Sequence, residues 1–519
     1  MFSTRHIAPP VLTLVTVLAV VGCAAADDGN TSPGTTDTVR STLLTDPSTF
    51  DPARATATDD YQVARLLYDT LLRRDDGNRL VGGLARTWES VSASEYVLTL
   101  RDDATCSDGT PITAEVVAAS LSRFMDPATG SSARSLAFGR GQSTVTADDA
   151  AGTVRISLTE PWSDLLTGLT LPQSGIVCPA GLADLDALAA GTATGAFSGP
   201  YTLAEAQPAV SYRFDLRDDY DAWPEFSTPL TGTPAASVAL VPLSDDATTA
   251  TQLLAGALDV APIFDDNVAR LETGGGFDAV TVTSSTSYVV FNEREGTIFH
   301  DNRDLRLTVA RLIDPEALND IVTSGRGEVL HTLASNNVPY VVADSPAAIA
   351  YDPNAAGSLA GVHIAMIGTT AFGEANDYIA EVLRAAGATV DLSAVDNATW
   401  STTTGAGGSG WDLTLQGDVN AMGTLPSSLL RVMGPTTEQG GRSKTGADNA
   451  EGYSALQRAL AATDDADKAA AFAEAQESVL ARVDALPLVS SVATWFSAPG
   501  FSVRAFGDYV DISTLRLTD

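Results

Sequence analysis

Hydrophobic and polar residues alternate most clearly near residue 96. Tyr96, Leu98 and Leu100 alternate with Val97, Thr99 and Arg101, the period of two expected of a strand with one buried face. Residues 153–159 (TVRISLT) repeat this alternation. The pattern therefore predicts two strands, one before and one after a helical segment.

That helical segment has clear start and stop signals. Residues 108–109 (Asp-Gly) predict a tight turn, and Thr113 is suited to cap a helix over residues 114–124. Residues 125–127 (Met-Asp-Pro) end it. The order strand, turn, capped helix is predicted for this stretch.

Later in the chain, strand and helix patterns alternate. Residues 361–368, 387–395 and 411–418 have strand character, and residues 371–386 have helical spacing between the first two. Such alternation indicates a parallel α/β lobe, with Gly387 as a helix C-cap.

A further region has helical character. The Ala-rich stretch 451–480 predicts two helices broken near residues 463–464.

Length and charge narrow the class of protein. A chain of 519 residues exceeds the roughly 250 to 300 residues that one hydrophobic core serves, so two or three lobes are expected. The 44% hydrophobic content is that of a folded chain. The formal charge of −35 repels phosphate backbones, which makes nucleic acid a poor partner. The simplest explanation of this acidity is that it keeps the protein soluble.

The first residues predict export and a lipid anchor. Arg5 and His6 precede an apolar run over residues 11–21, which is shorter than the roughly 20 residues of a membrane-spanning helix. Small residues before Cys23 resemble the lipobox of bacterial lipoproteins, which implies a signal peptide over residues 1–22 and acylation of Cys23. The alternatives are an uncleaved helix or a secreted protein with a chance cysteine. Residues 23–38 are expected to form a flexible tether.

One segment carries a family resemblance. Residues 84–127 contain LA-x-x-W-E, then L-R-x-x-A-x-x-S-D-G-T-P-I-T-A-E-x-V, then S-L-x-R. This order closely resembles the oligopeptide-type (family 5) extracellular solute-binding proteins of ABC importers. Residues 41–76 resemble the family's opening strand, loop and first helix, which implies a helix over residues 61–72. Residues 195–223, 252–260 and 288–315 resemble later stretches of the same family, although Phe197 replaces a glycine of its pattern.

The resemblance implies the fold. It predicts an α/β, two-lobed periplasmic-binding-protein-like fold of type II with an extra small lobe, hinged around a central cleft. Lobe I is expected to comprise residues 39–72, 191–286 and 487–519, the inserted small lobe residues 73–190, and lobe II residues 287–486.

Candidate ligand-binding residues follow from the same resemblance. The loop and helix that contain Thr56, Thr58 and Tyr61 line the cleft in the family, although a plain surface loop is an equal alternative for each. Asp418 falls where peptide-binding members have an aspartate that pairs with the ligand's amino group. Here Pro426 comes later than the family's proline, which puts peptide specificity in question.

Aromatic residues of lobe II, together with Asn292, complete the candidate set. Residues 411–422 are expected to face the cleft, and Tyr288, Trp400 and Trp411 could offer flat apolar walls to a solute. Asn292 lies in the segment that resembles the family signature at the crossing into lobe II. Ordinary core packing is the alternative for each aromatic residue.

The cysteines beyond Cys23 predict a disulfide. Only Cys106 and Cys178 remain, and an exported protein meets an oxidising compartment, so the two are expected to be bonded. Two separately buried thiols are the alternative.

Catalytic and metal chemistry have little support. The histidines after the signal peptide, His300, His331 and His363, are far apart, and the chain contains no HExxH, CxxC, GxSxG or Walker A pattern. Residues 405–410 fit GxGxxG, but they follow a threonine run instead of a strand, so a loop is expected. No enzyme activity, cofactor or metal is predicted.

The sequence therefore predicts a monomeric, lipid-anchored solute-binding protein on the outer face of the bacterial cell membrane. It would deliver a solute, with a short peptide the first candidate, to the permease and ATPase subunits of an ABC importer. Alternatives are a metal chelate, an opine or an oligosaccharide as solute, or a peptide receptor that senses without import.

Overall fold

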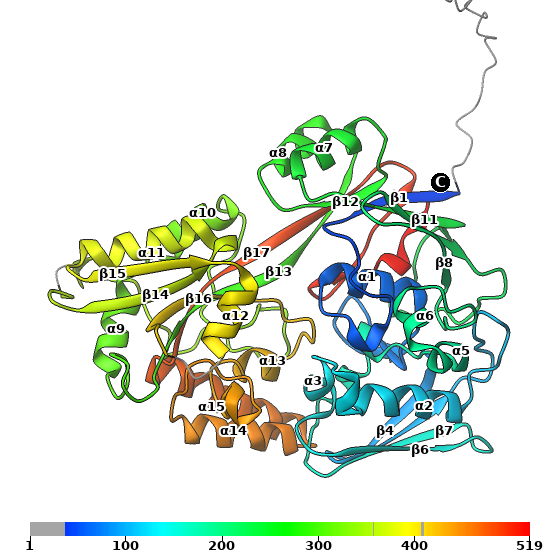
Figure 1. Cartoon of the computed structure of the whole chain (residues 1–519), viewed down its shortest axis with the longest axis horizontal. Helices are drawn as coiled ribbons and strands as arrows, with labels where there is room; N and C mark the ends of the chain where they lie inside the picture. Colours follow the sequence, from blue (N-terminus) through cyan, green and yellow to red (C-terminus); the bar gives the residue numbers. More distant parts are fainter. Residues whose placement is uncertain (1–36, 356–357, 406–408, 519) are drawn as a thin grey trace, which may run out of the picture. The chain divides into compact units, whose positions relative to one another are not determined.

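The computed structural model describes residues 37–355, 358–405 and 409–518, and Figure 1 traces its helices and strands. Cys23, the signal peptide and nearly all of the expected tether lie outside the described residues. Among the helices described, none has both the length and the apolar character needed to cross a bilayer.

The first sheet has four strands in the order β1-β11-β9-β8. β1 and β11 are parallel, and the other neighbours are antiparallel. Alternate residues such as Val39, Val238 and Phe214 are fully buried and pack with α1 in one core. The bounds are β1 Thr38–Leu43, β8 Tyr201–Gln207, β9 Ser211–Leu216, β11 Ser237–Pro242 and α1 Thr58–Leu67.

The predicted helix over residues 61–72 is displaced in the structure. α1 begins at Thr58, because the Asp60 carboxylate accepts hydrogen bonds from the backbone amides of Thr56 and Ala57 and supports an earlier first turn. It ends at Leu67, since Tyr68 has extended dihedral angles. Residues predicted as its last turn instead lead into β2 Leu72–Arg74, which pairs with β3 Leu80–Gly82.

The second sheet, β4-β5-β7-β6, is antiparallel throughout and confirms the two strands predicted from alternation. Tyr96 and Leu98 are fully buried against α2. Thr113 caps α2 by accepting a hydrogen bond from the Val116 amide at 3.4 Å, as predicted. The bounds are β4 Ala85–Ser92, β5 Glu95–Leu100, β6 Ser143–Asp148, β7 Thr153–Leu158 and α2 Ala114–Met125.

The third sheet has six strands in the order β12-β17-β13-β16-β14-β15. The predicted parallel pairing holds for β14 with β15 and with β16, but antiparallel β13 and β17 extend the sheet, so it is mixed. The strands are β12 Val260–Ile263, β13 Asp278–Phe291, β14 His363–Thr369, β15 Thr389–Val395, β16 Leu413–Asp418 and β17 Ala485–Ser497.

β13 and β17 are long strands that pair with each other over most of their length. The pairing shifts register between Thr283 and Ser285 and again between Ser287 and Tyr288. The lobe boundaries predicted near residues 286 and 486 fall inside these two strands, which run side by side in Figure 1.

Helices α9, α10 and α11 pack on the β14 part of this sheet through one core that includes Val309, Leu318, Ile379 and Ile364. α11 ends as predicted, because Gly387 follows it with a φ of +100°, a conformation that favours glycine. The bounds are α9 Arg303–Leu312, α10 Pro315–Thr323 and α11 Gly373–Ala385.

The stretch predicted as two broken helices forms the pair α14 Ala450–Ala461 and α15 Asp465–Arg482. Asp464 makes the break, since its carboxylate accepts hydrogen bonds from the Ala466 and Asp467 amides at 2.9 and 3.1 Å. The two helices lie side by side in Figure 1.

The remaining elements are short. The helices are α3 Arg134–Phe138, α4 Leu165–Gly168, α5 Pro179–Ala183, α6 Leu185–Ala189, α7 Asp246–Leu254, α8 Asn267–Gly274, α12 Asn397–Gly405 and α13 Leu425–Leu429. The strands are β10 Thr233–Pro234, β18 Phe501–Ser502, β19 Ala505–Phe506, β20 Tyr509–Val510 and β21 Arg516–Leu517. Residues 406–408 of the GxGxxG match lie outside the described residues, between α12 and β16.

Candidate functional site

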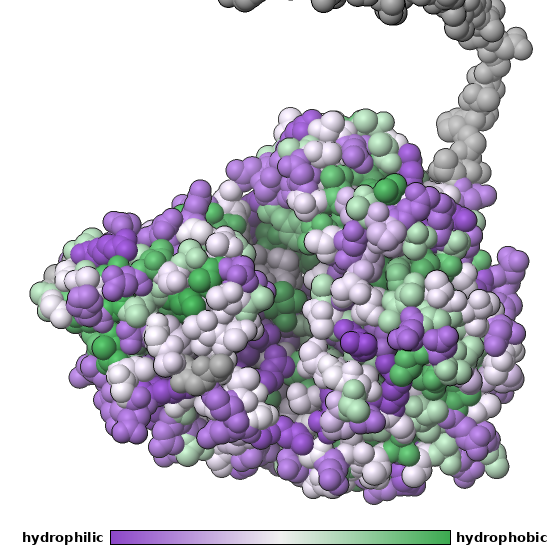
Figure 2. Space-filling view, viewed as in Figure 1, coloured by the Kyte–Doolittle hydropathy of each residue, from purple (hydrophilic) through white to green (hydrophobic). Residues whose placement is uncertain are grey.

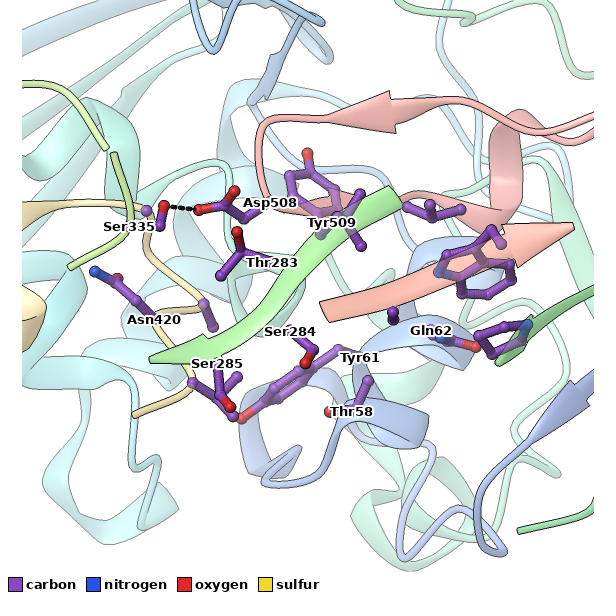
Figure 3. Close-up of a pocket in the computed structure, with 18 of the residues that line it drawn as sticks. Thr58, Tyr61, Gln62, Thr283, Ser284, Ser285, Ser335, Asn420, Asp508 and Tyr509 are labelled. Carbon is purple, nitrogen blue, oxygen red and sulfur yellow. Dashed lines mark hydrogen bonds between the residues drawn. The ribbon is translucent and has the colours of Figure 1, made fainter. Parts of the chain in front are cut away.

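A cavity of about 210 Å³ lies beside the middle of β13 and the C-terminal part of β17. Figure 3 shows its lining, and Figure 2 shows a recess with hydrophobic residues on its floor on the same face of the molecule as Figure 1. α1, β13, the segment after β16 and the segment around β20 all contribute side chains. Those labelled in Figure 3 are Thr58, Tyr61, Gln62, Thr283, Ser284, Ser285, Ser335, Asn420, Asp508 and Tyr509.

Two aspartates position the α1 side of this cavity. Asp59 accepts a hydrogen bond from the Leu44 amide at 2.9 Å, and Asp60 accepts one from the Ser48 amide at 2.7 Å. Both carboxylates lie in the first turn of α1, near the positive end of the helix dipole. The loop before α1 is therefore fastened to the helix, and Tyr61 follows directly at the cavity wall.

Tyr61 and the two threonines predicted with it have different surroundings. Thr58 and Tyr61 line the cavity, whereas Thr56 is exposed and is not part of the lining. The Tyr61 hydroxyl donates a hydrogen bond to the Thr56 carbonyl oxygen at 3.1 Å. Burial and the nearby charge of Asp60 raise the pKa of Tyr61, so its hydroxyl stays protonated near neutral pH.

Asp418 lies at the end of β16 and is fully buried. Its Oδ1 is 2.7 Å from Arg431 Nε, and its Oδ2 accepts a hydrogen bond from the Tyr288 hydroxyl at 3.4 Å. Although burial lowers the pKa of Arg431, the Asp418 carboxylate raises it above its ordinary value. In this structure Asp418 therefore lines the cavity while already paired with an arginine of its own chain.

The other predicted residues of this region lie in the interior. Tyr288 and Asn292 are fully buried, and Trp411 is 2% exposed. The Asn292 side chain donates a hydrogen bond to the Trp411 carbonyl oxygen at 2.8 Å. Burial and the Asp418 charge raise the pKa of Tyr288 well above 10. The structure thus brings Thr58, Tyr61 and Asp418 to one cavity, whereas Tyr288, Asn292 and Trp411 are not among the residues that line it.

Three cations near Asp418 were not among the predicted site residues: Arg431, Arg442 and Lys444, here named the cation cluster. Lys444 Nζ lies 3.5 Å from the centre of the Trp400 ring, so this predicted wall is covered by an amine. One sequence signal could have found Lys444, since the chain has only two lysines, Lys444 and Lys468.

A second cavity, of about 360 Å³, opens beside Arg442. Its lining combines residues near α3 and β7 with residues near α14, and it includes the charged side chains Arg140, Glu160 and Arg442. Arg140 donates a hydrogen bond to the Gln439 carbonyl oxygen at 3.1 Å, which joins the two sides of this cavity.

The predicted disulfide is present. Cys106 and Cys178 are bonded, with their Cα atoms 6.0 Å apart. The bond fastens the turn before α2 to the start of α5. Closing a loop of this length lowers the entropy of the unfolded chain, which stabilises the fold by about 4 to 5 kcal/mol in the chain-entropy account.

Metal ligation has no candidate in the described part of the chain, where no group of three or more His, Cys, Asp or Glu side chains could hold an ion.

Comparisons with known proteins agree on one family. Residues 79–439 match the pattern of Bacterial extracellular solute-binding proteins, family 5 Middle. A substrate binding protein from Microbacterium hydrocarbonoxydans, solved in complex with 4-hydroxybenzoate hydrazide, is 41% identical with a TM-score of 0.80. That comparison covers 93% of this chain and 100% of the other.

More distant relatives extend the picture. The periplasmic murein peptide-binding protein MppA of Escherichia coli K12 is 28% identical over 302 residues, and the match covers 54% of each chain. This chain thus spans about half the length of the curated relatives it matches. NikA from Brucella suis, in complex with Fe(III)-EDTA, is 18% identical over 93% of this chain and 100% of the other, with a TM-score of 0.77, and shows the fold alone.

These comparisons confirm the two-lobed periplasmic-binding-protein-like α/β fold. Because the matched pattern spans most of the chain and a 41% identical structure covers nearly all of it, the chain belongs to the bacterial extracellular solute-binding proteins of family 5.

Proposed function

We propose that this chain captures a small solute between lobe I and lobe II and delivers it to the permease of an ABC importer whose ATPase subunits supply the energy. The observation that carries this proposal is the shared cavity lining. Tyr61 from α1 and Asp418 from β16 meet at one cavity beside the paired strands β13 and β17. Hinged closure of two lobes over such a cavity is how periplasmic binding proteins trap solutes.

A short peptide is the first candidate solute. The murein peptide-binding protein and a probable D,D-dipeptide-binding protein of Escherichia coli are both relatives of this chain. Asp418 is the candidate partner for a peptide amino group, because a buried carboxylate binds an ammonium group strongly. In this mode Arg431 would have to release Asp418 when the peptide enters.

A small aromatic compound is the second candidate. The protein from Microbacterium hydrocarbonoxydans, 41% identical to this chain, was solved with 4-hydroxybenzoate hydrazide. The cavity of about 210 Å³ is smaller than the roughly 300 to 1,000 Å³ of typical ligand pockets, which favours a compact solute. In this mode Asp418 would keep its pairing with Arg431, and Tyr61 would supply an aromatic wall.

Native mass spectrometry of the full chain, purified from its own host, tests solute capture directly. We expect a retained small molecule that leaves on mild unfolding. A thermal-shift series with dipeptides, tripeptides and 4-hydroxybenzoate hydrazide then separates the candidates, since a ligand raises Tm according to its affinity. Protein that retains nothing and responds to no solute in either assay would contradict the proposed function.

Asp418→Asn distinguishes the two solutes. If peptides bind through their amino group, this variant should lose the Tm increase caused by peptides, and an N-acetylated peptide should raise the Tm of neither the variant nor the wild type. If the solute is aromatic, the increase caused by 4-hydroxybenzoate hydrazide should persist. Ser284→Ala, at the wall of the same cavity, is the matched control.

We also propose that acylated Cys23 tethers the protein to the outer face of the cell membrane. The motif before Cys23 supports this. Replacing Cys23 by Ser should release the protein from the membrane fraction and remove the lipid from its measured mass. Wild-type protein that is found without lipid would refute the anchor.

Import distinguishes transport from sensing. A strain that lacks this protein should fail to accumulate the retained solute in radiolabelled form, and the wild-type gene should restore uptake. Unchanged uptake together with a lost transcriptional response to the solute would favour the receptor alternative. The same purified protein should elute as a monomer in size-exclusion chromatography with light scattering.

A further inference from the structure

The cation cluster holds more positive charge than its surroundings neutralise. Arg431 pairs with Asp418 at 2.7 Å. In the part of the chain that the structure describes, the side chains of Arg442 and Lys444 make no hydrogen bond or ion pair, and Lys444 instead lies over Trp400. Three cations therefore face one carboxylate.

The backbone holds these cations together. The Lys444 amide donates a hydrogen bond to the Arg431 carbonyl oxygen at 2.9 Å, and the Arg442 amide donates one to the Pro435 carbonyl oxygen at 3.1 Å. The Thr445 hydroxyl donates to the Val432 carbonyl oxygen at 2.8 Å. Since the segment between α13 and α14 is fixed in this way, like charges cannot separate by a simple movement of the loop.

The electrostatic cost is visible in the two unpaired side chains. Burial, and then the charge of Arg431, lower the pKa of Arg442 to about 10. The same two causes lower the pKa of the Lys444 amine to about 7. Burial of an unpaired cation is unfavourable unless a counter-charge arrives, so the cluster is preorganised for an anion.

The composition of the chain makes this excess notable. The chain has 65 acidic residues and 30 basic ones, so carboxylates are abundant partners. Lys468, the only other lysine, pairs with Asp164 at 2.8 Å. Lys444 has no such partner among the described residues. A general shortage of carboxylates therefore does not explain its unpaired state.

From this geometry we infer that Arg442 and Lys444, with Arg431 behind them, form a subsite for the carboxylate group of the solute. Arg442 borders the second cavity, of about 360 Å³, which gives a small molecule access to the cluster. An arginine binds a carboxylate through two parallel hydrogen bonds and a lysine adds a third donor. This inference rests on the proposed capture of a small solute and adds that the solute is an anion.

Competitive acetylation of the wild-type chain tests this subsite, because its two lysines serve as sample and control. At pH 7.5, trace acetic anhydride should label Lys444 faster than Lys468, since only a neutral amine reacts. Trialanine or 4-hydroxybenzoate at millimolar concentration should protect Lys444 and leave Lys468 unchanged. The neutral counterparts, trialanine amide and 4-hydroxybenzamide, should protect Lys444 about tenfold less, as expected for the loss of a charge-assisted hydrogen bond.

The variant Arg442→Gln sharpens the test. It should reduce protection of Lys444 by carboxylates about tenfold while labelling of Lys468 stays as in the wild type. Protection by inorganic phosphate alone would overturn the carboxylate assignment, and so would equal protection by acid and amide or no protection by either carboxylate. If native mass spectrometry still finds a retained solute in those cases, the proposed function stands and only the subsite fails.

Discussion

Two groups of arginines differ in whether nearby carboxylates balance their positive charge. Arg73 has two counter-charges: its guanidinium pairs with Asp511 and, at 3.2 Å, with Asp69, and all three side chains are at most 2% exposed. Around Arg431, two further cations have no counter-charge in the described chain. The first arrangement holds the fold together. The second arrangement destabilises the ligand-free protein, and an anionic ligand would relieve this by supplying the missing counter-charge.

The largest effect is expected from breaking the matched network. Arg73→Met leaves the carboxylates of Asp69 and Asp511 buried without their main partner, which should destabilise the protein by about 3 to 5 kcal/mol. Denaturant unfolding followed by tryptophan fluorescence measures this loss. Arg86→Met is the control: Arg86 is 59% exposed in its pair with Asp102, so that variant should change stability little.

A substitution in the cation cluster is expected to stabilise the protein instead. Lys444→Met removes a cation that burial and Arg431 disfavour, so it should stabilise the ligand-free protein by about 1 kcal/mol after allowance for the solvent that reaches this amine. Lys468→Met should instead be destabilising, because it removes the partner of Asp164. Calorimetry of the two variants checks the contrast, which a drop in Tm for Lys444→Met would overturn.

A pH titration sharpens the same comparison. The pKa of the Lys444 amine falls from its ordinary value of 10.5 to about 7 in the folded chain, where Arg431, Arg442 and Asp418 surround it. Between these two values the unfolded chain binds more protons, so Lys444 makes stability rise as pH increases from 7 towards 10. Relative to Lys444→Met, the Tm of the wild type should therefore improve with pH. Parallel curves would show that this amine does not titrate as described.

The smallest effect is expected from an exposed pair. Arg155 and Glu95 face solvent, with side chains 50% and 38% exposed, on the strands β7 and β5. Arg155→Ala should cost no more than about 1 kcal/mol, and added salt should reduce the difference further. A larger loss, measured by the same denaturant unfolding, would show that an exposed charge pair in this protein contributes as much stability as a buried one.

Patterns local in sequence predicted the fold well. The alternation at Tyr96 and Leu98, the Thr113 cap and the break at Asp464 are each decided by neighbouring residues, and the structure confirms them. The helix expected over residues 61–72 is displaced in the structure, because the carboxylates of Asp59 and Asp60 bind an earlier loop, a contact that the family resemblance did not indicate. The disulfide was predicted because only two cysteines could form it.

The site was harder to predict, because its residues come from distant segments. The family resemblance identified Tyr61 and Asp418 as candidate residues, and the structure places both at one cavity. The resemblance did not indicate that Arg431 already pairs with Asp418. Asn292 and Trp411 remain predicted ligand contacts, although both are buried in this structure. The prediction that the chain is not an enzyme is confirmed by its relatives, which are binding proteins.

The two register shifts in β13 have a mechanical consequence. They lie within residues 283–288, next to the point where Thr286 pairs with Asp418. A bulge interrupts the hydrogen-bond ladder and increases local twist, so a long ribbon resists bending least at such a place. We therefore expect any bending of β13 against β17 to be concentrated beside Asp418, where changes in the ionic contacts of that carboxylate would influence it most.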